Sequence, residues 1–234
     1  MNFFSIQETS NIFLSVLVGL ALTACATNNA YRTNDNGTCD VMKDSVERCS
    51  ASAIQIHNQG QKTEYKLGFV EINDQGQFRD NREQLNVLIK ELENTPKDEP
   101  LIISVFVHGW HHNAKEGDAN IESFKDSLAK LTSVYEPFFE IKRKVFGVYV
   151  GWRGDSVTVD YLNELTFWDR KNTAGNVGHV GLSELLLKLE KVKNERNEAE
   201  SKGKDRNRLA IIGHSFGGAA VYQEIGRASC RERV

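Results

Sequence analysis

The sequence predicts an α/β fold built on a mostly parallel sheet. Apolar, β-branched runs recur at 101–107, 144–150 and 209–213, and continuous runs of this kind are typical of strands buried on both faces. Segments with leucines at helical spacing stand between them, at 120–135 and 182–198. Strands that alternate with helices form right-handed crossovers, which give a parallel sheet with functional residues at the carboxyl ends of its strands.

Residues 1–24 are expected to be a lipoprotein signal peptide. The apolar stretch 11–22 is too short to span a bilayer, and its length suits the hydrophobic region of an export signal. It leads into Leu22-Thr-Ala-Cys25, which resembles the bacterial lipobox, whose cysteine is lipidated. The resemblance implies that Cys25 anchors the protein to the cell envelope, and Ala26 favours the periplasmic side of the outer membrane. A buried helix is the alternative for this stretch.

Residues 25–52 are predicted to be a flexible tether between the anchor and the folded body. They are rich in Asn, Thr, Asp and Ser and hold few large apolar residues. Cys39 and Cys49 both lie in this segment. In an exported chain two nearby cysteines favour one local disulfide, and two unpaired thiols are the alternative.

The folded domain is predicted to cover residues 53–224 and to begin with antiparallel strands. Residues 53–57 and 65–72 alternate between inward and outward positions and are followed by turn-forming residues. Asp80-Asn-Arg-Glu83 has the pattern of a helix capping box, and leucines recur at helical spacing after it. The strands and helices described above complete the domain.

The residues 208–218 carry the strongest functional motif. An apolar strand leads into Gly213-His-Ser-Phe-Gly217, which matches G-x-S-x-G, and small residues then begin a helix. In such a strand–turn–helix the serine lies at a strained apex, and glycines two positions to either side leave room for the tight turn. Ser215 is therefore the candidate nucleophile. The side chain of His214 is expected to point away from it and not to act as its base.

Two motifs together resemble the α/β-hydrolase superfamily over residues 101–223. His108-Gly-Trp110 ends one parallel strand, and the G-x-S-x-G match ends another. The resemblance implies that the backbone N–H groups of Trp110 and Phe216 stabilise the oxyanion, with Gly109 or His111 as alternatives to Trp110. It also implies a serine esterase or lipase-like hydrolase that forms an acyl-enzyme on a small acyl ester or lipid and uses no cofactor.

In that superfamily the triad acid and base follow the nucleophile in the chain. Residues 225–234 match what a widely used sequencing adapter encodes in one frame, and a natural basic tail is the alternative. We therefore expect the sheet to be incomplete after the elbow helix, the acid and base to lie downstream of Glu224, and this chain to be inert. Asp155 is another candidate acid, although a loop salt bridge or cap is the simpler interpretation. The aromatic segment 157–180 is expected to form either a lid or core beneath a long loop.

Two other functions compete with the serine hydrolase. His108, His111 and His112 lie near Glu116 and Asp118, and such a cluster could bind a metal ion in a metal-dependent hydrolase. The H-x-x-H-H spacing is not a recognised zinc pattern, so no metal is predicted. A non-catalytic envelope lipoprotein with the same fold is the second alternative. The net charge of −3 gives no indication of a nucleic-acid-binding surface.

Overall fold

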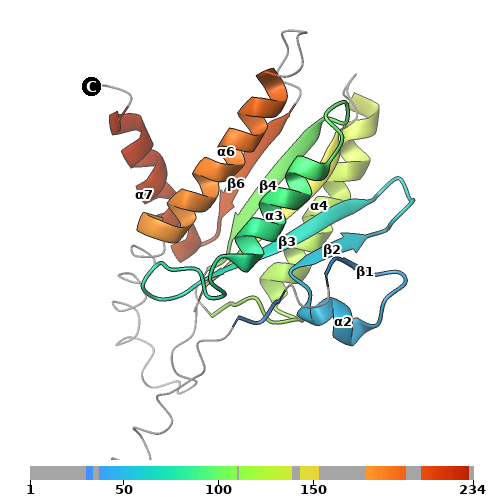
Figure 1. The fold of residues 1–234 in the computed structure, drawn as a ribbon, viewed down its shortest axis with the longest axis horizontal. Coiled ribbons are helices and arrows are strands. Elements are labelled where there is room, and N and C mark those ends of the chain that lie inside the picture. The colour runs from blue at the N-terminus through green and yellow to red at the C-terminus, as the bar shows by residue number, and fades with distance from the viewer. Residues whose placement is uncertain are drawn as a thin grey trace, which may run out of the picture.

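The computed structural model describes residues 30–33, 37–109, 111–138, 143–152, 178–198 and 207–231. Its centre is a six-stranded sheet with the order β1–β2–β3–β5–β4–β6 (Figure 1). The strands are β1 (Cys39–Asp40), β2 (Ile54–His57), β3 (Tyr65–Ile72), β4 (Leu101–Val107), β5 (Lys144–Trp152) and β6 (Arg208–Gly213). All neighbouring pairs are parallel except β2 and β3, which are antiparallel. The predicted α/β fold with a mostly parallel sheet is confirmed.

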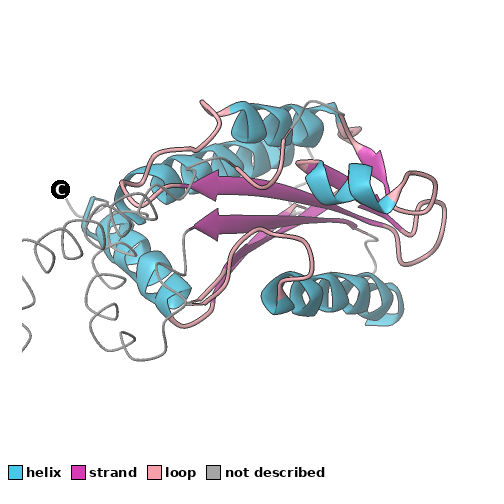
Figure 2. Ribbon diagram, turned by 90° about the horizontal axis from the view of Figure 1, so that it is seen from below, coloured by secondary structure: helices cyan, strands magenta, loops and turns pink. Residues whose placement is uncertain are grey.

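Helices cover both faces of this sheet (Figure 2). They are α2 (Val46–Ala51), α3 (Glu83–Asn94), α4 (Ala119–Phe138), α6 (Ser183–Glu198), which follows a π-helical turn (Gly178–Leu182), and α7 (Phe216–Arg231). None of the helices in the described part of the chain is both long and apolar enough to span a bilayer.

Alternate residues of the central strands feed two separate hydrophobic cores. On β4, Ile103, Val105 and Val107 pack with the apolar sides of α3, α6 and α7. Ile102 and the partly buried Phe106 point the other way, into a core that contains the apolar side of α4. A strand buried on both faces has no side exposed to solvent, and this explains why its sequence is apolar apart from the buried Ser104.

The helix after β3 begins later than its sequence pattern predicts. Asn81 and Arg82 both have positive φ, at 52° and 75°, so the chain turns sharply before α3 starts at Glu83. The Asp80 carboxylate still accepts a hydrogen bond from the Gln84 backbone N–H at 2.6 Å. The predicted capping box, with Glu83 in the third helical position, is therefore wrong, although Asp80 does cap the helix start.

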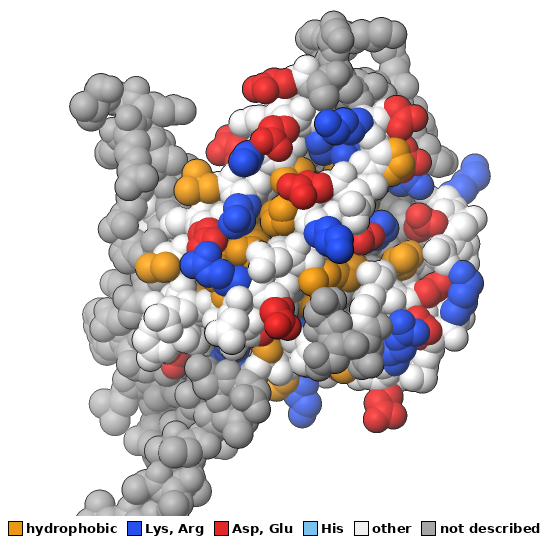
Figure 3. Space-filling model, in the orientation of Figure 1, with side chains coloured by type: hydrophobic (Ala, Val, Ile, Leu, Met, Phe, Trp, Pro, Cys, Tyr) orange, Lys and Arg blue, Asp and Glu red, His pale blue; other side chains and the backbone are white. Residues whose placement is uncertain are grey.

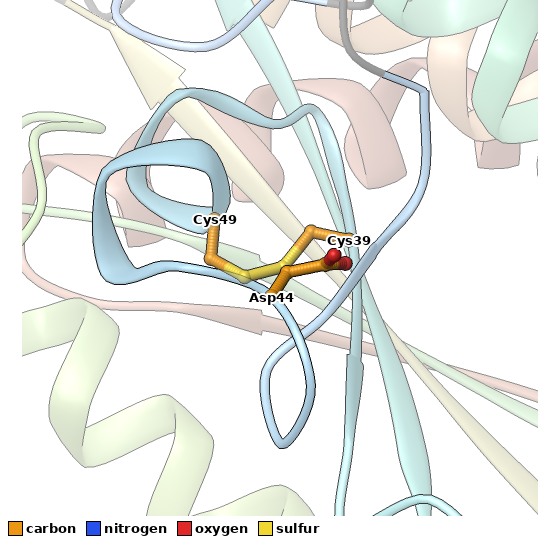
Figure 4. A group of neighbouring side chains, drawn as sticks. All are labelled: Cys39, Asp44 and Cys49. Carbon is orange, nitrogen blue, oxygen red and sulfur yellow. A yellow bond between two sulfur atoms is a disulfide. The ribbon is translucent and has the colours of Figure 1, made fainter.

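The segment predicted to be a flexible tether is folded from residue 37 to residue 52. β1 pairs with β2, α2 follows, and Cys39 is completely buried. Cys39 and Cys49 form a disulfide with their Cα atoms 5.3 Å apart, beside the side chain of Asp44 (Figure 4). The disulfide and the pairing with β2 order a segment that has too few apolar side chains to form a core of its own.

The structure describes only one of the two predicted terminal segments. The signal peptide, residues 1–24, and Cys25 lie outside the described residues. At the other end, α7 continues past Glu224 to Arg231 and so includes most of the segment predicted to follow the domain.

The surface seen in Figure 3 carries both signs of charge. Lysine and arginine side chains alternate with aspartate and glutamate across this face, with small apolar areas between them. No large area of one sign is visible on this side of the molecule.

Candidate active site

The carboxyl ends of β4 and β6 bring two sequence motifs together. The strands are parallel neighbours, with Val107 opposite Gly213. Beyond the strands, the backbone N–H of His214 donates to the Val107 carbonyl oxygen at 3.0 Å. The order β5–β4–β6 therefore places His108 and Gly109, which follow β4, beside the serine that follows β6.

Ser215 is held in a strained turn between β6 and α7. Its φ of 53° lies in the left-handed region, which costs a residue with a Cβ atom roughly 1–2 kcal/mol. Two hydrogen bonds close the turn: the Gly217 N–H donates to the His214 carbonyl oxygen at 2.9 Å, and the Ala219 N–H donates to that of Ser215 at 3.2 Å. The serine is exposed at the edge of the sheet. Non-glycine residues in such strained conformations are concentrated at functional sites.

The glycines of the motif are required by the tightness of this turn. A Cβ atom on Gly217 would lie 2.2 Å from the Val107 carbonyl oxygen and 2.5 Å from that of His108. A Cβ atom on Gly213 would lie 2.5 Å from the Cα atom of Gly218. Backbone atoms on both sides cannot move away without breaking the sheet or the helix, so no larger residue fits these two positions.

The predicted oxyanion-hole groups are only partly described. Phe216 is the first residue of α7, so its backbone N–H lies at the positive end of the helix dipole, next to Ser215. Trp110 lies outside the described residues. Its neighbour Gly109 packs against the elbow, since a Cβ atom there would be 3.0 Å from the Cβ of Ser215. His111 has a φ of 66°, so the chain makes a sharp turn at this residue.

His108 is a structural residue rather than a ligand or base. It is completely buried and stacks on Trp152, with ring centroids 5.4 Å apart. Its Nε2 accepts a hydrogen bond from the Trp152 backbone N–H at 2.9 Å, so Nδ1 carries the proton and donates to the Gly109 carbonyl oxygen at 2.8 Å. Burial lowers the pKa of His108 to about 4, against smaller opposing effects of its hydrogen bonds. Both ring nitrogens are occupied in a neutral imidazole.

His112 belongs to a polar network at the start of α4. Its Nδ1 lies 3.0 Å from Oδ1 of Asp118, and its Nε2 lies 3.1 Å from Nδ2 of Asn120. The Asp118 carboxylate also accepts from the backbone N–H groups of Asn113 and Asn120, at 3.1 and 2.8 Å. The His112 ring is 6.2 Å from the His214 ring, centroid to centroid, so this network borders the elbow.

The loop that carries His108, His111 and His112 does not form a metal site within the described residues. Both nitrogens of His108 and both of His112 make hydrogen bonds inside the protein. Among the described residues, the one group with metal-ligand geometry is Cys39, Asp44 and Cys49, and there the two sulfur atoms are bonded to each other. The geometry of the loop therefore gives no support to the metal-dependent alternative.

The structure does not place two other predicted features relative to this site. Asp155 and nearly all of the aromatic segment 157–180 lie outside the described residues. A pocket of about 150 Å³ lies at the opposite, amino-terminal edge of the sheet, where Tyr65, Leu101 and Lys144 begin β3, β4 and β5. The length of the strands separates this pocket from Ser215. A substrate group bound in the pocket would therefore not reach the serine.

The sequence did not indicate which residues hold the loop after β4. Arg32 is completely buried, and its Nε donates to the Ala114 carbonyl oxygen at 2.9 Å. The Tyr149 hydroxyl donates to the carbonyl oxygen of Asn113 at 3.2 Å. The sequence presents Asp118 as a possible metal ligand, although its place just before a helix is a capping position that indicates its role.

Fold and site together define an α/β protein with a mostly parallel sheet and a strained serine at the carboxyl edge of that sheet. Comparisons of the chain with family models, with curated proteins and with solved structures gave no match.

Proposed function

We propose that this protein is a serine hydrolase of the α/β-hydrolase type, which cleaves carboxylic esters through an acyl-enzyme on Ser215. The observation that supports this most is the conformation of Ser215: an exposed serine at φ 53°, in a turn too tight for any residue but glycine at positions 213 and 217. Protein stability alone gives no reason to keep a non-glycine residue there. A nucleophile presented at the edge of the sheet gives one.

The proposed reaction follows from the groups around the serine. A base takes the Ser215 Oγ proton, and Oγ attacks the ester carbonyl carbon to form a tetrahedral intermediate. The negative oxygen of that intermediate would be stabilised by the Phe216 N–H and by an N–H of the loop after β4. The alcohol then leaves with a proton, and water releases the acid from the acyl-enzyme.

The general base is expected to come from another part of the protein. His108 is excluded because its Nε2 is buried and accepts a hydrogen bond from Trp152. His112 uses its Nε2 to accept from Asn120. The resemblance to α/β-hydrolases implies a histidine and an acid that follow the elbow in the chain.

We further propose that the protein acts at the bacterial cell envelope, held by a lipid on Cys25. The Cys39–Cys49 disulfide supports this proposal, because disulfides persist in exported proteins and are rare in the reducing cytosol. A lipid-anchored hydrolase would meet acyl esters or lipids at the membrane surface.

Reaction with a fluorophosphonate probe tests the catalytic proposal. The protein, expressed from its complete open reading frame, should be labelled covalently and should hydrolyse a p-nitrophenyl ester. Ser215→Ala should lose both activities while keeping its circular dichroism spectrum, because only the nucleophilic oxygen is removed. Labelling that persists in Ser215→Ala would show that another residue is the nucleophile.

A further inference from the structure

The loop between β4 and α4, residues 108–118, forms one wall of the candidate site. We call it the β4–α4 loop; position 110 lies outside the described residues. Gly109 is in close contact with His214 and Ser215, since a Cβ atom at position 109 would be 2.8 Å from Nδ1 of His214 and 3.0 Å from the Cβ of Ser215. A shift of this loop would therefore move one side of the site relative to the nucleophile.

One carboxylate ties the middle of this loop to its end at α4. Asp118 lies immediately before α4, and its side chain is 8% exposed. It accepts from Nδ1 of His112, from the Asn113 N–H and from the Asn120 N–H at distances of 3.0, 3.1 and 2.8 Å. The first two donors lie in the middle of the loop, and the third belongs to the helix. The carboxylate thus joins the loop to the start of α4.

The contacts of His112 fix its tautomer. Asp118 can only accept when ionised, so Nδ1 of His112 carries the proton. In the neutral ring Nε2 is then the acceptor for Nδ2 of Asn120, at 3.1 Å. Both nitrogens are used to hold the ring between Asp118 and Asn120, and its plane lies at 62° to that of the His214 ring.

We propose that His112 is a positioning residue, which together with Asp118 holds the β4–α4 loop at the distance from Ser215 that acyl transfer requires. This inference rests on the proposed hydrolase function. Oxyanion donors are effective because they are in place before charge develops, and a misplacement of about 1 Å can reduce the rate on the order of 100-fold.

The rival role for His112 is that of the general base. An aspartate on Nδ1 would give a base this same tautomer. In the structure, however, the lone pair of Nε2 is directed to Asn120 rather than left for the serine. The two roles differ in which nitrogen matters: a positioning residue needs the Nδ1 donor, and a base needs Nε2.

His112→Asn separates these roles, because the asparagine amide can still donate to Asp118 but has no equivalent of Nε2. His112→Ala removes both. Lys115→Ala is the matched control, because the Lys115 side chain lies in the same loop and is exposed. The rate of fluorophosphonate labelling should fall about tenfold or more in His112→Ala, and should stay within about threefold of wild type in His112→Asn and Lys115→Ala. The pH dependence of labelling should be the same in His112→Asn and wild type.

Hydrogen exchange gives a readout that does not depend on catalysis. Amides of residues 111–118 should exchange faster in His112→Ala and at the wild-type rate in His112→Asn. Unchanged exchange in His112→Ala would overturn the proposal, as would a His112→Asn variant labelled as slowly as His112→Ala, which would indicate a base. If the wild-type protein is not labelled at all, the hydrolase proposal fails, and the exchange data alone decide whether His112 holds the loop.

Discussion

Ser215 combines a strained backbone with tight packing, and the two have one cause. The chain reverses direction between β6 and α7 within a few residues, so the serine takes a left-handed φ of 53° and the flanking glycines touch backbone atoms. Gly217 lies against the carbonyl oxygens of Val107 and His108, the last residue of β4 and the one after it. The turn therefore depends on the neighbouring strand as well as on its own residues.

Gly217→Ala should disrupt the elbow. The new Cβ atom would lie 2.2 Å from the Val107 carbonyl oxygen, and overpacking of this kind destabilises proteins by about 1–3 kcal/mol or more. Gly218→Ala is the matched control, since its Cβ atom would meet nothing closer than 3.3 Å. Urea denaturation of both variants measures the difference. Equal stability of the two variants would show that the turn is looser than described.

At the scale of single residues, the sequence was informative where sterics determine the residue type. The strand–turn–helix around Gly213, Ser215 and Gly217 could be predicted because few backbone arrangements tolerate that pattern. The roles of His108 and His112 could not, because a histidine can be a ligand, a base or a buried hydrogen-bonding group. Only the three-dimensional contacts with Trp152 and Asp118 distinguish these roles.

The segment around Arg32 is an integral element of the fold. The Arg32 guanidinium is fully buried, lies over the Phe69 ring and donates to the carbonyl oxygens of Cys49 and Ala114. It also forms an ion pair with Glu116 at 2.8 Å. One side chain thus joins β3, the end of the disulfide-closed segment and the β4–α4 loop.

Arg32→Met should destabilise the protein strongly. Methionine can keep the contact with Phe69 but removes the donor of the Ala114 carbonyl oxygen, and a buried polar group left unpaired costs about 1–3 kcal/mol. Lys43→Met is the control in the same segment: its side chain is 70% exposed and its ion pair with Asp40 lies at the surface, so the loss should stay within about 1 kcal/mol. Equal effects in chemical denaturation would contradict the role of Arg32.

Regular elements with apolar periodicity were predictable, and the polar N-terminal segment was not. The strand 65–72 and the strand 101–107 have the predicted limits, and α4 and α6 differ from their predictions by a few residues at most. The composition of residues 37–52 predicts a tether, but the structure orders them through a disulfide, β-pairing and a buried arginine. These long-range contacts leave no periodic pattern in the sequence.

At the scale of the whole molecule, strand order determines where chemistry can occur. β4 lies between β5 and β6, so the residues that follow β4 and β6 meet at one edge, although the strands are about a hundred residues apart in the chain. The sequence predicted the parallel sheet and the positions of the two motifs at the ends of its strands. It did not predict how the β4–α4 loop is held, because Arg32, Asp118 and Tyr149 reach that loop from three separate parts of the chain.

The proposed envelope location makes a separate prediction for the whole protein. When expressed in a bacterium, the wild-type protein should be found in the membrane fraction and Cys25→Ser in the soluble fraction, because the variant cannot receive the lipid. Cys39 and Cys49 should resist alkylation in both proteins until a reductant and denaturant are added, since both residues are buried. Wild-type protein in the soluble fraction would contradict the anchor.

The most direct test of the central claim is to identify the residue that a fluorophosphonate modifies. The protein from the complete open reading frame is labelled, digested and examined by tandem mass spectrometry. We predict one adduct, on Ser215 in the peptide that contains Gly213 and Gly217. An adduct on another residue, or no adduct on protein shown to be folded, would contradict the assignment of this protein as a serine hydrolase with its nucleophile at the β6–α7 turn.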